Sequence, residues 1–409
     1  MENMVCSYIG MEFISSKKAI EMSLSYSNKT DAESRAATSI IDSVEGRITI
    51  ISDPLLSDRG PTRPVVLLLR TLATKGYRVK VVAPIVSLSM RRKLEEPNVE
   101  LIDLGFKYMF SGDTSTLFET WIRETFFRSE PRKITEFAGL TINLSSCLLF
   151  ASHVWYIQGP VLITVTVDSI YSEMPWRYKV PYKFARPLID LLDAKFVYNT
   201  ARASKMMFAN SRYTAVLFKS IGLKIDGVIF PPVDMEKFRP TARTPSNDYI
   251  LTYFGKETKY STVKKVADEG IKIKAFGGKI TPLSKEMLTH RNIEFLGAVD
   301  DDQLIDLYSN ALFTFFPFTN EPFGYIPVES MSCGTPVLSF GRQGPAETVL
   351  NDRTGWLVED DHEMVKMAKK LWKLKYDPNM RTLCVNHVKK NFDKKIFADK
   401  LLKSLKKLG

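Results

Sequence analysis

"RITIISDPLLSDRGPTRPVVLLLRTLATKGYRVKVVAP", residues 47–84, predicts a strand, a loop, a helix and a second strand in that order. Residues 47–52 are a short apolar run rich in β-branched side chains, and residues 78–84 are a second such run. Between them, residues 65–77 carry apolar side chains at helical spacing. A strand followed by a helix and another strand is typical of a parallel sheet.

The same alternation continues along the chain on both sides of a polar segment rich in proline, residues 227–248, which we interpret as a linker. Apolar runs before it predict strands at 99–105, 161–167 and 205–211. Runs after it predict strands at 249–255, 271–278, 293–297, 311–318, 335–340 and 355–360, with helices at 301–310 and 361–373. These later strands are almost continuously apolar, as expected of parallel strands covered on both faces.

We therefore expect an α/β protein with two doubly wound, Rossmann-like domains that face each other across a cleft. Residues 1–45 are a serine-rich extension of uncertain order, and residues 46–230 form the first domain. The second domain spans residues 231–390, and a basic C-terminal helix occupies residues 391–409.

Composition limits the classes of function. The 409 residues include 57 Lys and Arg against 46 Asp and Glu, a net charge of +11 that suits nucleic acid, phosphorylated small molecules or an acidic membrane. Four cysteines without a CxxC pair and four histidines indicate neither a disulfide framework nor a metal site. The N-terminus lacks a basic segment followed by an apolar run, so we expect a cytoplasmic protein.

Residues 140–167 contain no charged side chain, a length that would suffice to span a bilayer. The segment also contains several polar residues and the break Gly159-Pro160, and it ends in the β-branched run 161–167. We therefore predict a buried helix, a strand, a turn and another strand here, with a membrane span as the alternative.

"EPFGYIPVES", residues 321–330, places Glu321 in the loop after a predicted strand and Glu329 on the helix that follows. Ligands of open parallel sheets bind beyond the carboxyl ends of the strands, where this loop lies. If the helix begins near Gly324 or Tyr325, the amides of residues 323–326 point outward and suit a phosphate. Because two carboxylates would repel the phosphate itself, we expect them to accept hydrogen bonds from hydroxyl groups on either side of it.

This stretch resembles the retaining nucleotide-sugar glycosyltransferases of the GT-B fold, of the group 1 or family 4 type, which have a Glu, seven residues and a second Glu. The similarity extends through "CGTPVLSFGRQGPAETVLNDRTGWLVED" (333–360) and "IEFLGAVDDDQLIDLYSNALFTFFPF" (293–318). "FANSRYTA" (208–215) and "VIFPPVDMEKFRP" (228–240) are similar to the end of the family's first domain. The resemblance covers roughly residues 47–375 and implies an acceptor domain followed by a donor domain.

The resemblance implies a role for each matching residue of the second domain. Glu321 would hold hydroxyls of the transferred sugar and Glu329 the ribose, while the amides of Phe323, Gly324, Tyr325 and Ile326 would meet the sugar and diphosphate. Lys256 stands where the family usually has an Arg that neutralises the leaving diphosphate. The family usually has a Lys about five residues beyond that Arg; here Ser261 stands at that position, and Lys259, two residues earlier, would substitute for it from a shortened loop. The stretch "GRQGPAE" (341–347) resembles the family's turn before a Glu and places Gly344 near phosphate and Glu347 at the next helix start.

The first domain matches the family less well. "DRGPTRP" (58–64) occupies the place of a glycine-rich loop, so Gly60 would allow close approach of phosphate or acceptor and Arg63 would face an anionic acceptor. Many relatives have a cleft histidine where this chain has Gln158, and His153 lies before the strand. That departure leaves the contribution of the first domain to catalysis open.

Several of these residues also have a purely structural interpretation. Glu329 would favour the dipole of its helix without any ligand, and Glu321 would be a solvated loop residue. Lys256 and Lys259 would be surface lysines, Arg63 an ion-pair partner and His153 a core histidine.

The sequence therefore predicts a retaining transferase that moves a hexose, mannose or glucose, from a nucleoside diphosphate sugar to a glycan or lipid-linked acceptor. GDP-mannose is the favoured donor, and neither a metal nor a cofactor nor a nucleic acid is expected. In the C-terminal segment 389–409, the apolar residues Phe397, Leu401, Leu405 and Leu408 share one helical face beside many lysines. This face predicts either packing onto the first domain or peripheral attachment to the inner face of an anionic membrane.

Two other functions are compatible with the residues. A sugar-nucleotide 2-epimerase of the same fold would bind a similar donor without transferring the sugar to an acceptor. A non-enzymatic basic protein would bind nucleic acid with steep salt dependence, although the paired glutamates disfavour a polyphosphate partner.

Overall fold

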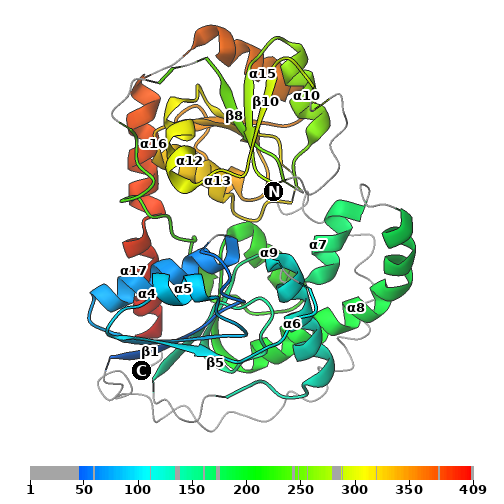
Figure 1. The fold of residues 1–409 in the computed structure, drawn as a ribbon, viewed down its shortest axis with the longest axis vertical. Helices are drawn as coiled ribbons and strands as arrows, with labels where there is room; N and C mark the ends of the chain where they lie inside the picture. Colours follow the sequence, from blue (N-terminus) through cyan, green and yellow to red (C-terminus); the bar gives the residue numbers. More distant parts are fainter. Residues whose placement is uncertain are drawn as a thin grey trace.

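A computed structural model describes residues 46–58, 60–110, 112–133, 139–159, 162–171, 176–241, 245–246, 248–255, 257–278, 287, 289–318, 320–375 and 378–406. The predicted extension 1–45 and the candidate site residue Lys256 lie outside this part of the chain. Figure 1 shows two α/β domains, one above the other, with the C-terminal helices running along one side of both.

The first domain contains a seven-stranded parallel sheet in the order β3-β2-β1-β4-β5-β6-β7. Its strands are β1 (Arg47–Ile51), β2 (Arg78–Ala83), β3 (Val99–Asp103), β4 (Leu140–Asn143), β5 (Ser152–Ile157), β6 (Ser204–Ala209) and β7 (Gly227–Val228). The helical segments are η1 (Gly60–Thr62), α4 (Arg63–Thr74), α5 (Leu88–Lys93), α6 (Asp113–Phe127), α7 (Ile163–Ile170), α8 (Trp176–Arg202) and α9 (Arg212–Ser220). Strand β1 pairs with both β2 and β4, so the connections run outward in both directions from the centre, as in a doubly wound sheet.

Helix α4 forms as the sequence predicts and begins with Arg63, which contacts the second domain. Pro64 lies in its first turn, where a missing N–H costs nothing. Its apolar face, which includes Val65, Leu69 and Leu72, is buried in the core against the sheet. Because that face is fixed, the position of Arg63 at the start of the helix is fixed as well.

The second domain contains a six-stranded parallel sheet in the order β10-β9-β8-β11-β12-β13. Its strands are β8 (Ile250–Tyr253), β9 (Ile273–Phe276), β10 (Ile293–Gly297), β11 (Thr314–Phe316), β12 (Val337–Phe340) and β13 (Gly355–Val358). The helices are α10 (Tyr260–Asp268), α12 (Asp301–Asn310), α13 (Tyr325–Ser332), α14 (Pro345–Thr348), α15 (Asp361–Leu374) and α16 (Pro378–Asn391). The predicted fold class, α/β with two doubly wound parallel sheets, is confirmed.

The last helix, α17 (Lys394–Leu405), crosses back onto the first domain and packs against α4 (Figure 1). Phe397, Leu401 and Leu405 are buried in the core of that domain. Of the two alternatives predicted for this apolar face, packing onto the first domain is therefore confirmed, while attachment of the basic side chains to a membrane stays a prediction. Burying these side chains against α4 and against Tyr156 of β5 removes them from water without any lipid.

The uncharged segment 140–167 also differs from the prediction. It begins with strand β4 rather than a buried helix, and the run 161–167, predicted as a strand, leads into helix α7. The carboxylate of Asp193 on α8 accepts hydrogen bonds from the amides of Ile163 and Thr164 (2.9 Å each), which satisfies the first turn of α7. This cap from a distant residue outweighs the strand preference of the β-branched side chains. None of the described helices is both long enough and apolar enough to cross a bilayer.

Candidate active site

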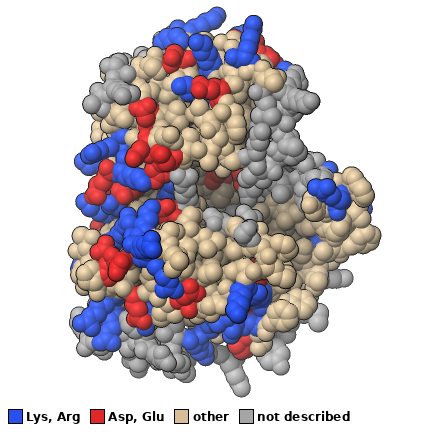
Figure 2. All heavy atoms as spheres, viewed as in Figure 1, with Lys and Arg blue, Asp and Glu red and all other residues tan. Residues whose placement is uncertain are grey.

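Glu321 and Glu329 follow strand β11, which lies beside β8 at the point where the strand order reverses. The loop after β11 carries Glu321 and leads into α13, which begins at Tyr325 after Gly324, as predicted. Helix α13 lies on the side of the second domain that faces the first (Figure 1), and the molecular surface is hollowed between the two domains (Figure 2). The left-handed backbone of Gly324 (φ 91°) makes the sharp entry into the helix, which favours glycine there.

Glu321 is held in place by the backbone around it. Its Oε1 accepts hydrogen bonds from the amides of Phe323 (3.3 Å) and Gly324 (2.9 Å). Two of the four amides that we expected to meet a phosphate are thus engaged with Glu321 in this structure. A carboxylate offers about four lone-pair sites, so Glu321 keeps the capacity to accept bonds from sugar hydroxyls.

Glu329 is buried in the first turns of α13 and bonds to both domains. Its carboxylate pairs with the guanidinium of Arg63 from α4 of the first domain, and the side chains of Arg63 and Glu329 are 15% and 5% exposed. Its other oxygen, Oε2, accepts a hydrogen bond from the hydroxyl of Tyr308 on α12 (3.3 Å). Tyr308 was not predicted from the sequence, because its position in an amphipathic helix is indistinguishable from an ordinary core position.

Arg63 is also surrounded by aromatic rings of the second domain. Its guanidinium lies 5.2 Å from the ring centre of Tyr325 and 5.6 Å from that of Phe238. Burial raises the pKa of Tyr325 far above its ordinary value although Arg63 opposes the shift, so this hydroxyl is neutral. Within the described part of the chain, the Tyr325 hydroxyl has no hydrogen-bond partner. Arg63 thus lies at the predicted donor site, and its predicted contact with an acceptor remains a prediction.

Gly344 packs directly against the backbone of the Glu321 loop. A side chain at this position would place its Cβ 2.4 Å from the backbone of Phe323, so only glycine allows this approach. The Gly344 amide donates to the carbonyl of Glu321 (2.9 Å), and Gln343 Oε1 accepts from the Glu321 amide (3.0 Å). Gly344 therefore lies near the predicted donor site because it packs against the loop that would hold the donor.

Glu347 lies in α14, at the helix start that we predicted, and reaches the first domain. Its two carboxylate oxygens accept from the amides of Arg212 (2.7 Å) and Tyr213 (2.8 Å) at the start of α9. Burial at this contact raises the pKa of Glu347, partly offset by those two hydrogen bonds. It is a second polar contact between the domains besides that of Arg63 with Glu329.

The side chain of Lys259 turns away from the other predicted donor residues. Its Nζ lies 2.7 Å from Asp361 Oδ1 at the start of α15, and although burial would raise the pKa of that carboxyl, its bond to Lys259 keeps the pKa below the ordinary value. Lys259 lines a hollow of about 680 Å³ shared with α10 and α15, and none of the other predicted donor residues within the described part of the chain lines that hollow. Gly255, just before Lys256, leaves no room for a side chain because Tyr253 lies 2.2 Å from its Cβ position.

The first-domain candidates are more dispersed. Gly60 adopts a left-handed turn (φ 59°) with open space around it, just before α4. Gln158 follows β5 and donates to the carbonyl of Leu144 (2.5 Å), next to Gly159, whose Cβ position lies 3.2 Å from Pro322 of the Glu321 loop. His153 lies within β5 and accepts from the amide of Thr141 (3.1 Å), and burial lowers its pKa, as for a core histidine.

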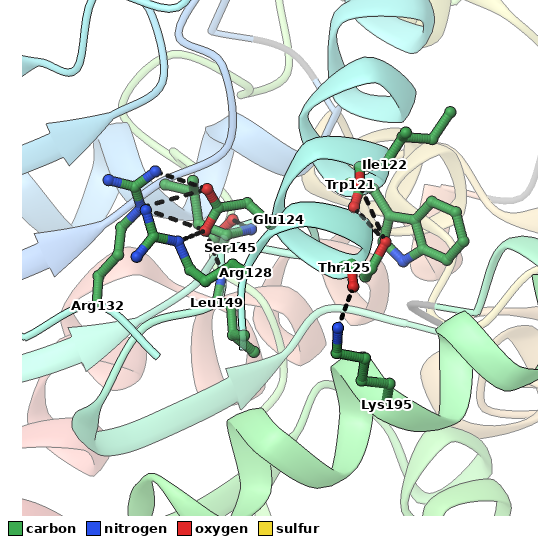
Figure 3. Close-up of polar contacts among 10 residues, drawn as sticks. Trp121, Ile122, Glu124, Thr125, Arg128, Arg132, Ser145, Leu149 and Lys195 are labelled. Carbon is green, nitrogen blue, oxygen red and sulfur yellow. Dashed lines mark hydrogen bonds and ion pairs between the residues drawn. The ribbon is translucent and has the colours of Figure 1, made fainter. Parts of the chain in front are cut away.

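Two buried carboxylates that the sequence did not single out stabilise the loops of the first domain. Asp53 accepts hydrogen bonds from Ser145, Ser146 and Cys147 after β4. Figure 3 shows Glu124 of α6 paired with Arg132 (2.7 Å) and Arg128 (3.4 Å). Both sets of contacts lie within the first domain, and they fix the residues that lead into β5. Among the described residues no group of three or more His, Cys, Asp or Glu side chains is arranged to hold a metal ion.

Residues 275–391 match the sequence model of a family described as glycosyl transferases group 1. The mouse alpha-1,3/1,6-mannosyltransferase ALG2 is 24% identical over 268 residues, which cover 55% of this chain and 63% of that protein. The D-inositol 3-phosphate glycosyltransferase of Acidothermus cellulolyticus is 33% identical over 87 residues, 21% of this chain and 19% of that protein. The chain thus spans less than two thirds of the length of these relatives.

Solved structures resemble the whole two-domain arrangement. The sucrose-phosphate synthase of Thermosynechococcus elongatus matches with a TM-score of 0.66 at 18% identity, over 88% of this chain and 98% of that one. WaaG, a glycosyltransferase involved in lipopolysaccharide biosynthesis, matches with a TM-score of 0.59 at 13% identity, over 88% and 99%. Anabaena HepE in complex with UDP and glucose matches with a TM-score of 0.56 at 14% identity, over 88% and 99%. The chain therefore has the GT-B fold of these glycosyltransferases, and residues 275–391 of its second domain are similar to the glycosyl transferases group 1 and to mannosyltransferases.

Proposed function

We propose that this protein transfers a hexose, with mannose as the leading candidate, from a nucleoside diphosphate sugar to a glycan or lipid-linked acceptor with retention of configuration. The observation that carries the proposal is the placement of Glu321, the start of α13 and Glu329 together at the point where the strand order reverses. The group 1 family match covers the same residues.

The donor sugar would lie against Glu321. The amides of Phe323 and Gly324 hold Oε1 of this carboxylate in one orientation before any ligand arrives, which lowers the ordering cost of accepting sugar hydroxyls. The amides of Tyr325 and Ile326 follow in the first turn of α13, and the partial positive charge of this helix end suits a diphosphate. Gly344 keeps the loop in this shape.

The nucleoside would lie against Glu329, which we propose accepts the ribose hydroxyls. In the structure this carboxylate is engaged by Arg63, so ribose binding requires the guanidinium to shift toward the diphosphate or to move away with the first domain. Lys256 would neutralise the leaving diphosphate, as the resemblance implies, and its position lies outside the described residues. A role for Lys259 would require it to leave Asp361.

The choice of donor rests on analogy with the relatives. The similarity to the mouse mannosyltransferase favours GDP-mannose, whereas Anabaena HepE forms a complex with UDP and glucose. The buried free thiols Cys147, Cys333 and Cys384 suit a reducing compartment, so we propose a cytoplasmic protein that meets a lipid-linked acceptor at the inner face of a membrane.

A thermal-shift panel of GDP-, UDP- and ADP-sugars tests the donor site. We expect one nucleotide class to stabilise the protein, and Glu321→Ala and Glu329→Ala to weaken that stabilisation. Glu95→Ala, which removes an exposed carboxylate of the first domain, is the matched control and should leave the shift unchanged. If neither the unmodified protein nor any variant responds to any sugar nucleotide, the proposal is wrong.

Release of nucleoside diphosphate tests the reaction itself. Transfer releases one nucleoside diphosphate for each sugar moved to the acceptor, whereas a 2-epimerase converts the donor without needing an acceptor. We expect the release of nucleoside diphosphate to depend on added acceptor. We also expect the NMR signal of the anomeric proton to show that the transferred sugar keeps the configuration that it has in the donor.

A further inference from the structure

Helix α8 has two parts with different surroundings. Its C-terminal part is anchored to the first domain: Lys195 donates to the carbonyl of Thr125 on α6 (2.6 Å; Figure 3), and Phe196 and Val197 are buried in the core. Its N-terminal part extends away from the sheet with α7, on the right of the first domain in Figure 1. The N-terminal part is therefore held in a defined position without being covered.

This N-terminal part exposes a row of large apolar side chains. Trp176 and Phe184 are 79% and 81% exposed, values at which almost the entire side chain meets water. Their partners in the row, at intervals of three or four residues, are Val180, Leu188 and Leu191, which are all exposed as well. Because this spacing places the five residues on one face of a helix, they form a continuous stripe, which we name the α8 stripe. Contiguous exposed apolar surface of this kind usually marks an interaction site.

The charge beside the α8 stripe is positive. Residues 176–187 contain the four cations Arg177, Lys179, Lys183 and Arg186 and no Asp or Glu. Arg186 is paired with Asp168 (2.9 Å), whereas Arg177 and Lys183 are exposed, and Arg177 lies over the ring of Tyr178. In the view of Figure 2 the lobe on the right that carries α8 shows Lys and Arg side chains on an otherwise uncharged surface.

Exposed apolar side chains beside several cations indicate which kind of partner the α8 stripe would bind. Trp, Tyr and Phe together with Lys and Arg are the residues enriched where proteins meet the headgroup layer of a bilayer. The aliphatic members of the stripe, Val180, Leu188 and Leu191, cannot stack on bases, so a nucleic acid would leave them in water. An anionic bilayer would bury the stripe and at the same time attract the cations beside it.

We propose that the N-terminal part of α8, residues 176–191, docks the protein onto an anionic lipid bilayer. This inference replaces α17, whose apolar face is buried, as the membrane-facing element of the chain. The role of this docking in sugar transfer rests on the proposed function, because docking would bring a lipid-linked acceptor within reach of the space between the two domains. Vesicle binding is measured without donor or acceptor, so its failure would leave sugar transfer untouched.

The test uses the full chain and sedimentation with vesicles of phosphatidylcholine alone or with one quarter phosphatidylserine. We expect binding to the anionic vesicles that weakens with added salt. Arg177→Gln with Lys183→Gln should lower the partition coefficient about 25-fold, because each cation near an anionic surface contributes roughly fivefold. Lys400→Gln with Lys403→Gln removes the same charge from exposed positions of α17 and should change the coefficient far less.

The apolar part of the stripe is tested with Trp176→Ser and Phe184→Ser together, which should lower the partition coefficient at least tenfold. The matched control is Leu88→Ser with Leu374→Ser, which removes exposed apolar side chains from α5 and α15. Circular dichroism of each variant checks that it is folded. The proposal is overturned if the unmodified protein ignores anionic vesicles, or if both α8 variants bind as well as their controls. It is equally overturned if the stripe variants convert a dimer into a monomer without changing vesicle binding.

Discussion

Replacing Arg63 with methionine would break the ion pair that joins the two domains. Methionine keeps much of the apolar length of arginine between the rings of Tyr325 and Phe238 but leaves Glu329 without its cation. The remaining partner in the described structure is the hydroxyl of Tyr308, at 3.3 Å. The variant therefore measures how much the free energy of unfolding falls when the buried carboxylate of Glu329 loses its cation.

The magnitude follows from burial. With Arg63 and Glu329 only 15% and 5% exposed, solvent screens the pair weakly, and breaking a buried pair on one side typically costs about 3–5 kcal/mol. For a domain of this size that loss would lower the urea midpoint by about 1–2 M. Arg70→Met is the matched control, because Arg70 lies on the same helix and, among the residues that the structure describes, its guanidinium bonds only to the carbonyl of Lys93 at an exposed position. We expect the control to cost less than about 1 kcal/mol.

Urea unfolding followed by circular dichroism provides the measurement, and a double-mutant cycle provides the test of cause. In a Glu329→Gln background the neutral amide needs no counter-ion, so Arg63→Met should cost less than about 1 kcal/mol there. If Arg63→Met is no worse than Arg70→Met, or costs equally much with Gln at position 329, then the pair does not stabilise the contact between the domains.

Three further predictions concern single positions. Gly344→Ala should cost about 1–3 kcal/mol in the same unfolding assay and weaken donor stabilisation, because its Cβ would lie 2.4 Å from the Phe323 backbone; Gly341→Ala, with its nearest neighbour at 3.5 Å, should be nearly neutral. Burial raises the pKa of Asp193 to about 6, above the roughly 4 of an unfolded chain. The folded state therefore binds more protons between these values, so stability should fall by on the order of 3 kcal/mol as pH rises from about 4 to about 6, and Asp193→Asn should flatten this slope. Iodoacetamide, with labelling read by mass spectrometry, should reach three buried thiols of raised pKa only after unfolding: Cys147, Cys333 and Cys384.

The sequence predicted the elements whose signals are local. Helix α12 was predicted at its observed bounds, and its signals are local: Asp300 and Gln303 form a capping box in the structure, and Leu304 and Tyr308 fall on one buried face. The start of α13 at Gly324 and Tyr325 was also predicted correctly, and its signal is local as well: the left-handed backbone before the helix favours glycine.

The failures concern contacts between residues far apart in the chain. The run 161–167 was predicted as a strand from its β-branched residues, but the cap from Asp193 some thirty residues later makes it the start of α7. The partner of Glu329 could not be predicted either, because Arg63 precedes it by more than two hundred and sixty residues and only the fold brings α4 and α13 together. Arg63 was noted as a candidate ion-pair residue, but sequence alone did not name its partner.

The Glu321 loop, α13 and α14 would bind the donor, and the same segments contact the first domain. Glu329 and Glu347 bond to the first domain, and Pro322, next to Glu321, lies against Gly159. These three contacts all involve the loops and helices that would hold the donor. Because a ligand shifts an equilibrium only through contacts that differ between its states, a donor that competes for Glu329 necessarily alters the free energy of the domain contact. If the ribose binds Glu329 as we propose, donor binding and domain arrangement are coupled through residues of the site itself.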